Sequence, residues 1–377
     1  MLGLVLSGGG ARGAYEAGVL RYVLDALPRS LGVDTTPRVI CGTSIGALTG
    51  AWVGALGTQG ARHLSSIWQR MEVEDVYRFT ARDLVRVPER LLGRRGPVSE
   101  AAALFDPAPL YRLMRETLPW SSLHDAIDGG RLKSFVVCAT DVASGFTVLF
   151  ADGEAPSKST PTTRVVATRV GADHCLASAA IPLVFPAVAV EGRYYVDGAL
   201  RQNTPLSPAV SLGVDRALVI GVKRSRGPGD ASEQAPAPTA AFLAGKALNA
   251  LMLDPIEEDL RRLAAMNGLL QWGQRAYPDF MERVHAEHKP YRVVRFVHVR
   301  PSLDLGRVAA EVWRAHAGEL PWATRTLLRG IAREEPESEA DLLSYLLFHK
   351  RYTAELEALG FEDARRSEEE IAGLFAA

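Results

Sequence analysis

The sequence predicts an α/β fold with helices added towards its C-terminal end, and three observations support this prediction. Short apolar runs of strand length alternate with longer stretches in which apolar residues recur at helical spacing. Two of these runs, residues 2–6 and 38–41, each lead into a glycine-containing turn and then into a helical pattern, as βα units do. The 377 residues suffice for one large domain with appended elements.

The other elements follow from the same patterns. Residues 2–6 are nearly all apolar, which is typical of a strand buried on both faces. Helical periods are expected to end where proline or glycine follows them. The expected strands are 2–6, 38–41, 134–140, 146–150, 193–196, 217–222 and 291–299, and the expected helices include 15–24, 47–56, 61–71, 104–120, 241–252, 256–272 and 339–359.

The composition argues against several classes of protein. Lys and Arg number 43 against 44 Asp and Glu, so the formal net charge is -1 and no nucleic-acid partner is expected. The three cysteines lack metal-ligand spacing and cannot close a disulfide set, which predicts buried thiols in a reducing compartment. Residues 1–6 lack the basic start of a signal peptide, and no apolar run approaches the ~20 residues of a membrane span. We therefore expect a cytoplasmic protein whose membrane contact, if any, is peripheral.

The first glycine loop, residues 7–13, follows the first expected strand directly. Gly8, Gly10 and Gly13 match the G-x-G-x-x-G pattern of dinucleotide-binding loops. That interpretation also needs an acidic residue at the end of the second strand, whereas Asp34 lies before that strand. Glycines beside a helix N-terminus can instead present backbone N–H groups to a negative oxygen. We favour this oxyanion-binding interpretation over a cofactor site or a plain turn.

The second turn, residues 42–46, reads Gly-Thr-Ser-Ile-Gly and follows the second expected strand. In a G-x-S-x-G turn the serine sits in a strained conformation with its hydroxyl exposed, and the glycines let strand and helix pass closely. The helix that follows directs its N-terminal amides at the turn. Ser44 is therefore a candidate nucleophile, and the candidate oxyanion donors are the amides of Gly9, Gly10, Ala11 and Ile45.

Together, these two turns resemble the patatin-like phospholipase family. Residues 177–186 are similar to the family's substrate-channel segment, and residues 196–199 with 203–205 are similar to its Asp-Gly-Gly/Ala motif. The four stretches follow one another in the family's order over the first 205 residues or so. The resemblance implies a three-layer α/β/α sandwich with a mostly parallel sheet.

The resemblance also implies an activity and a set of site residues. In the family, the serine is the nucleophile and the motif aspartate is its only protein base, which gives a Ser44–Asp197 dyad without histidine. The implied protein is a phospholipase A-like lipid acyl hydrolase that cleaves the carboxylic esters of phospholipids, lysophospholipids or acylglycerols through an acyl-enzyme. No acidic cluster resembles a calcium loop, so we expect neither metal nor cofactor. The implied site comprises the loop Gly8, Gly9, Gly10, Ala11, Arg12 and Gly13, the elbow Gly42, Ile45 and Gly46, and the supporting residues Asp141 and Gly198.

Three alternatives remain open from the sequence. Asp141 also follows a strand and rivals Asp197 as the base, because sites assemble at strand ends in open parallel sheets. His298 completes a Ser-Asp-His order along the chain, and His174 is a further candidate histidine. The glycine loop could also serve a lipid- or anion-binding module without catalysis.

The expected domain organisation has three parts. Residues 1–224 form the catalytic core, residues 225–240 are a linker rich in Gly, Pro, Ala and Ser, and residues 241–377 are a mainly helical part packed on the same core. Residues 73–105 carry arginines interleaved with leucine and valine, which fits either a membrane-docking lid or a solvated surface segment. The sequence does not indicate an oligomeric state.

Overall fold

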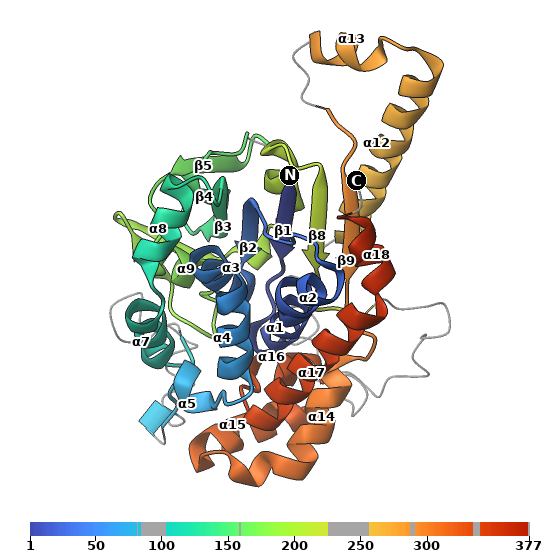
Figure 1. Ribbon diagram of the computed structural model, residues 1–377. Helices are drawn as coiled ribbons and strands as arrows, with labels where there is room; N and C mark the ends of the chain where they lie inside the picture. Colours follow the sequence, from blue (N-terminus) through green and yellow to red (C-terminus); the bar gives the residue numbers. More distant parts are fainter. Residues whose placement is uncertain are drawn as a thin grey trace.

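The structure is a computed structural model that describes residues 1–80, 82–83, 103–157, 160–224, 256–286, 291–334 and 340–375. Within these residues, nine strands form one sheet with helices on both faces (Figure 1). The strands are β1 (Leu2–Leu6), β2 (Val39–Thr43), β3 (Ser134–Asp141), β4 (Thr147–Gly153), β5 (Thr163–Ala167), β6 (Val188–Val190), β7 (Arg193–Asp197), β8 (Arg216–Ile220) and β9 (Arg295–Val299).

The central part of the sheet is parallel. The order is β5-β4-β3-β2-β1-β8-β9, and β7 pairs with both β3 and β6. The pairs β3–β2, β2–β1, β1–β8 and β8–β9 are parallel, whereas β4 and β7 both run antiparallel to β3. The α/β sandwich with a mostly parallel sheet is thereby confirmed. The short strands β5 and β6 were not predicted from the sequence.

Along the chain, some helices lie between these strands and the others follow β9. A π-helical turn, Tyr22–Ala26, joins the first helix of the chain to the second. The helix expected over 104–120 ends earlier, and a second helix begins after Pro119. The helices are α1 (Gly13–Arg21), α2 (Leu27–Leu31), α3 (Ile45–Leu56), α4 (Thr58–Trp68), α5 (Val73–Val76), α7 (Ala108–Thr117), α8 (Trp120–Asp128), α9 (Ala172–Ser178), α10 (Leu206–Ser211), α12 (Ile256–Ala276), α13 (Phe280–Ala286), α14 (Leu305–His316), α15 (Trp322–Glu334), α16 (Asp341–Leu346), α17 (Lys350–Arg366) and α18 (Glu368–Gly373).

Alternate residues of the strands face two apolar cores. Leu4 and Leu6 of β1 join the core shared with α1, α3 and α17, whereas Val5 joins the smaller core that includes residues of α10 and α12. The helices α1 and α17 pack so closely that only glycine fits at two positions, Gly18 and Gly360. A Cβ at Gly18 would clash with the backbone oxygen of Glu357, and one at Gly360 would clash with that of Tyr15. The C-terminal helix α17 is thus packed directly on the N-terminal βα unit.

Two sequence expectations fall outside the described residues. The linker expected at 225–240 and the helix expected at 241–252 lie there entirely. Most of the stretch 73–105 lies there as well, and its described ends include α5 and the buried residue Phe105. The lid or membrane-docking role of this stretch therefore stays a hypothesis.

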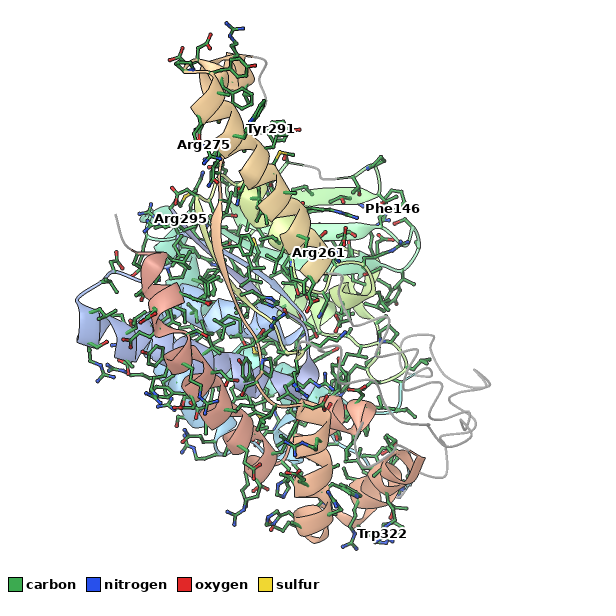
Figure 2. The ribbon with its side chains drawn as sticks, turned by 90° about the vertical axis from the view of Figure 1, so that its right-hand side faces the viewer. Phe146, Arg261, Arg275, Tyr291, Arg295 and Trp322 are labelled. Carbon is green, nitrogen blue, oxygen red and sulfur yellow. The ribbon has the colours of Figure 1, made fainter. Side chains whose placement is uncertain are left out.

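A helical arm formed by α12 and α13 projects from the body of the molecule (Figure 1). Figure 2 shows Arg261 nearer the body and Arg275 nearer the tip. Asn267 of α12 is hydrogen-bonded to Val294, just before β9, so the tip extends past the edge of the sheet where the parallel strands begin. None of the helices in the described ranges is long and apolar enough to cross a membrane.

Candidate active site

Ser44 and Asp197 meet because two strands end side by side on the same partner, β3. The parallel strand β2 ends with Thr43 opposite Cys138, and the antiparallel strand β7 ends with Asp197 opposite Ala139. The carboxyl ends of β2 and β7 thus converge on adjacent positions of β3. There, the Ser44 hydroxyl donates a hydrogen bond of 2.6 Å to Asp197 Oδ2.

Ser44 has the strained backbone expected of the G-x-S-x-G turn. Its φ of 55° and ψ of -126° are sparsely populated by residues with a side chain. The surroundings hold this conformation, because the Ser44 N–H donates to Ser178 Oγ at 2.8 Å and the Ser178 hydroxyl donates to the carbonyl of Cys138. A Cβ on Gly46 would lie 2.6 Å from the backbone oxygen of Leu6, so the elbow glycine allows α3 to pass close to β1.

Asp197 is buried, and its carboxyl group accepts two hydrogen bonds. Oδ2 accepts a hydrogen bond from the Ser44 hydroxyl. Oδ1 accepts a hydrogen bond of 2.8 Å from the Ala199 N–H. Burial raises the pKa of Asp197 to about 7, although the bonds from Ser44 and Ala199 favour the charged form. A Cβ on Gly198 would clash with the carbonyl of Cys138, so a glycine after Asp197 lets this turn lie against β3.

Asp141, the rival base, is engaged elsewhere. Its carboxylate forms an ion pair with Arg193 at 2.7 Å and accepts the Ser144 N–H at 2.9 Å. Burial tends to raise the pKa of Asp141, but the hydrogen bonds from Ser144 and Arg193 outweigh it and the pKa is lowered. The group therefore stabilises the turn between β3 and β4, and the structure places Asp197, not Asp141, at the Ser44 hydroxyl.

The structure does not bring the candidate histidines to this pair. His298 is on β9, which β1 and β8 separate from β2, a spacing of about 14 Å for three strand intervals. Burial, with the nearby Arg300, lowers the pKa of His298 to about 4. His174 is on α9, where its Nδ1 accepts the N–H of Gly171 at 3.1 Å. The triad Ser44–Asp197–His298 is therefore not assembled.

The glycine loop lies directly against the serine turn. A Cβ on Gly8 would be 3.0 Å from Ser44 Cβ, and the Gly8 N–H is bonded to Asn203 O at 3.2 Å. Gly10 has a φ of 54° and lines the same cavity as Ser44 and Ile45. In the described part of the chain, the N–H groups of Gly10 and Ile45 donate no hydrogen bond. The loop then closes with a 3-10 turn over Gly10–Arg12, and Gly13 opens α1.

Gly10, Ser44 and Ile45 line an apolar cavity. Among the described residues, its lining contains no Asp, Glu, Lys, Arg or His. Ile181 and Phe185, from the stretch that resembled a substrate channel, are part of the wall. Helices α3, α4 and α7 supply much of the remainder, including Trp52, Trp68 and Met114.

Some groups at the site were not singled out from the sequence. Ser178 and Asn203 each lie inside a stretch that resembled the family, so the motifs contained a signal for them. Tyr345 and Leu346 line the cavity from α16, far along the chain. Their stretch, residues 344–348, resembles the C-terminal part of bacterial patatin-like proteins, but the sequence did not place it at the serine. Among the described residues, no group of three or more His, Cys, Asp or Glu side chains could hold a metal ion.

The sheet, the serine turn and the glycine loop define an α/β protein of the patatin type. A family model described as patatin-like phospholipase matches residues 4–210, and the chain belongs to this family. Among solved structures, VipD from Legionella pneumophila is similar at 12% identity and a TM-score of 0.35, with 79% of this chain and 60% of the VipD chain covered. This chain thus spans less than two thirds of VipD. Curated protein sequences give no match.

Proposed function

We propose that this protein is a serine lipid acyl hydrolase of the phospholipase A type. The observation that carries the proposal is the hydrogen bond of 2.6 Å from the Ser44 hydroxyl to Asp197, beside an apolar cavity that Ser44 lines. The family acts on lipids, and this arrangement supplies a nucleophile, a base and a place for an acyl chain. The proposed substrates are phospholipids, lysophospholipids or acylglycerols.

Asp197 can serve as the base because its surroundings raise its basicity. A serine hydroxyl becomes a good nucleophile only when a base takes its proton in the transition state. A carboxylate in water is a poor base, but the pKa of Asp197, raised by burial to about 7, matches neutral conditions. An acyl chain in the cavity would exclude water further and so strengthen the same effect.

The proposed oxyanion donors are backbone amides of the glycine loop and of the α3 N-terminus. The N–H groups of Gly9, Gly10 and Ala11, with that of Ile45, are the candidates. Loss of one such donor costs about 100- to 1000-fold in rate in characterised hydrolases. The N-terminal end of α3 adds positive dipole character at the same place.

The proposed cycle has two steps. Ser44 Oγ attacks the ester carbonyl while Asp197 accepts its proton, and the tetrahedral oxyanion is held by the amides. The C–O bond to the leaving alcohol then breaks as Asp197 returns the proton to that alcohol. Water attacks the acyl-enzyme, gives one proton to Asp197, and releases the fatty acid as Ser44 recovers its hydroxyl proton.

A fluorophosphonate ester probe tests the nucleophile. We expect covalent labelling of the wild type and none of Ser44→Ala, because only an activated serine displaces the fluoride. Folded wild-type protein that stays unlabelled would instead support a lipid- or anion-binding module. A panel of phospholipids, lysophospholipids and acylglycerols, assayed for fatty-acid release with Ser44→Ala as the blank, identifies the substrate class.

A further inference from the structure

A short C-terminal segment, residues 341–348, forms part of the candidate active site. This α16 segment contains α16 and the two residues after it, and it lies well beyond residues 4–210 that match the family. Tyr345, Leu346 and Phe348 nevertheless line the same cavity as Ser44 and Gly10. Part of the wall of the site is therefore supplied from outside the matched region.

The α16 segment touches the glycine loop through its backbone. A Cβ on Gly10 would lie only 2.4 Å from the carbonyl oxygen of Tyr345. Gly10 also has a φ of 54°, so a residue with a side chain is disfavoured by conformation as well as by contact. Gly10 is thus packed against the backbone of α16 and lines the cavity that Ser44 also lines.

Arg12, the arginine of the loop, binds the same segment. Only 3% of Arg12 is exposed. Its Nη2 donates to Asp341 Oδ1 and its Nε to Ser344 Oγ, both at 2.8 Å. Its guanidinium lies over the Tyr345 ring, 4.2 Å from the centroid. Every hydrogen bond found for this side chain within the described residues goes to α16.

The other side of the α16 segment is held by the cavity wall. The buried Tyr77 hydroxyl donates to the carbonyl of Leu346 at 2.8 Å. The Phe348 ring stacks near Trp68 of α4, with centroids 6.2 Å apart. Because Tyr77 and Trp68 hold the α16 segment in place, the contacts between this segment and Arg12 can also hold the glycine loop in place.

We propose that Arg12 and the α16 segment are positioning residues that set where the loop amides point. This inference rests on the proposed function, since it assigns the segment to the oxyanion site of that reaction. Arg12 cannot itself face the oxyanion in this arrangement, because its donors are turned to Asp341 and Ser344. A misplacement of about 1 Å at a reacting group can cost about 100-fold, so a loose loop should lower kcat.

The variant Arg12→Lys tests this inference, because lysine keeps the charge but cannot make the forked contacts. We expect kcat for p-nitrophenyl butyrate to fall about 10- to 100-fold, with KM within about 3-fold of wild type. The short acyl chain keeps the far cavity out of the measurement.

Arg21→Lys is the matched control. Arg21 is the last residue of α1, the helix that follows Arg12. Its Nε donates to Glu357 of α17 at 2.6 Å, and its guanidinium covers the Phe361 ring, 4.0 Å from the centroid. It therefore makes the same kind of contact away from the cavity, and we expect its kcat to equal that of wild type. Equal kcat values for wild type, Arg12→Lys and Arg21→Lys would overturn the inference.

Asp341 gives a second test if Arg12→Lys does not fold. Asp341→Ala removes the acceptor of Arg12 and should lower kcat about 10-fold, whereas Asp341→Asn keeps an acceptor and should restore most of it. An Asp341→Ala enzyme with wild-type kcat would contradict the inference. Labelling by the fluorophosphonate probe separates the two hypotheses: wild type that is not labelled rejects the proposed function, whereas labelled wild type with unaffected variants rejects only the positioning role.

Discussion

Ser44 and Asp197 are 153 positions apart in the chain, yet a hydrogen bond of 2.6 Å joins their side chains. The bond exists because β2 and β7 approach β3 from opposite directions and end on its neighbouring residues Cys138 and Ala139. Neither strand alone would place a base beside the serine.

Replacement of Asp197 should separate activity from stability. We expect the rate of ester hydrolysis by Asp197→Asn to fall to the background rate, because asparagine cannot accept the serine proton. The folded-state pKa of Asp197, about 7, exceeds the usual value of 3.8, so the native state binds this proton more tightly than the unfolded state does. The free energy of unfolding therefore decreases as pH rises from about 4 to about 7.

Above about pH 7, the ionised carboxylate of Asp197 is buried at a cost in stability that a neutral asparagine does not have. Asp197→Asn should therefore be more stable than wild type at about pH 8, by up to ~4 kcal/mol for three pKa units. Urea unfolding of both proteins at low and high pH measures the difference. Full activity in Asp197→Asn would move the base role to another group, and a loss of fold would show that the carboxyl is needed for structure.

The pH dependence of hydrolysis should report the same carboxyl group. The base is active when ionised, so kcat/KM should rise through about pH 7 and level off above it. An uncharged ester substrate does not ionise, so the midpoint of the kcat/KM profile reports the pKa of a group on the free enzyme. A midpoint near the usual carboxyl pKa of about 4 would show that Asp197 is ionised too easily to be this buried base.

The histidine on β9 should be dispensable. His298 lies three strand intervals from β2, so we expect His298→Ala to keep kcat/KM within about 2-fold of wild type. The measurement is ester hydrolysis alongside the circular dichroism spectrum. A loss of several orders of magnitude with an intact fold would restore the Ser-Asp-His alternative.

Two glycines with similar backbone angles should respond differently to alanine. Gly10 and Gly32 have φ values of 54° and 66°, so each alanine pays a conformational cost of about 1–2 kcal/mol. At Gly32 there is nothing within 4 Å of the added Cβ, whereas at Gly10 the Cβ meets the Tyr345 carbonyl. We expect Gly32→Ala to retain activity and Gly10→Ala to lose at least ~100-fold. Equal kcat values would show that the loop tolerates displacement.

The cavity should set the preferred acyl length. Leu113 lines it, and Leu113→Trp should reduce the kcat/KM for long-chain relative to short-chain p-nitrophenyl esters about 10-fold, because the added ring fills space along the chain. Leu269→Trp on the exposed side of α12 is the control for a larger apolar residue outside the cavity. An unchanged chain-length profile in Leu113→Trp would place the acyl chain elsewhere.

Local chemistry explains why parts of this site could be predicted from the sequence. The runs 2–6 and 38–41 became β1 and β2, since apolar strands and glycine turns are specified by neighbouring residues. The strand β5 is as long as β1 but was missed because only one of its five residues is buried, and β6 was missed because it has only three residues. The family resemblance, confirmed over residues 4–210, supplied the pairing of serine with aspartate that periodicity alone could not.

The amino-acid sequence by itself determined the α/β class, the strained serine turn and the glycine loop, because each depends on residues within a few positions of one another. The resemblance already favoured Asp197 over Asp141, and only the tertiary structure gives the physical reason, since strand register on β3 brings Asp197 and not Asp141 to the serine. The tertiary structure also decided the partner of Arg12, which is Asp341, 329 positions away. Such contacts arise from the packing of whole elements, and no local pattern of residues encodes them.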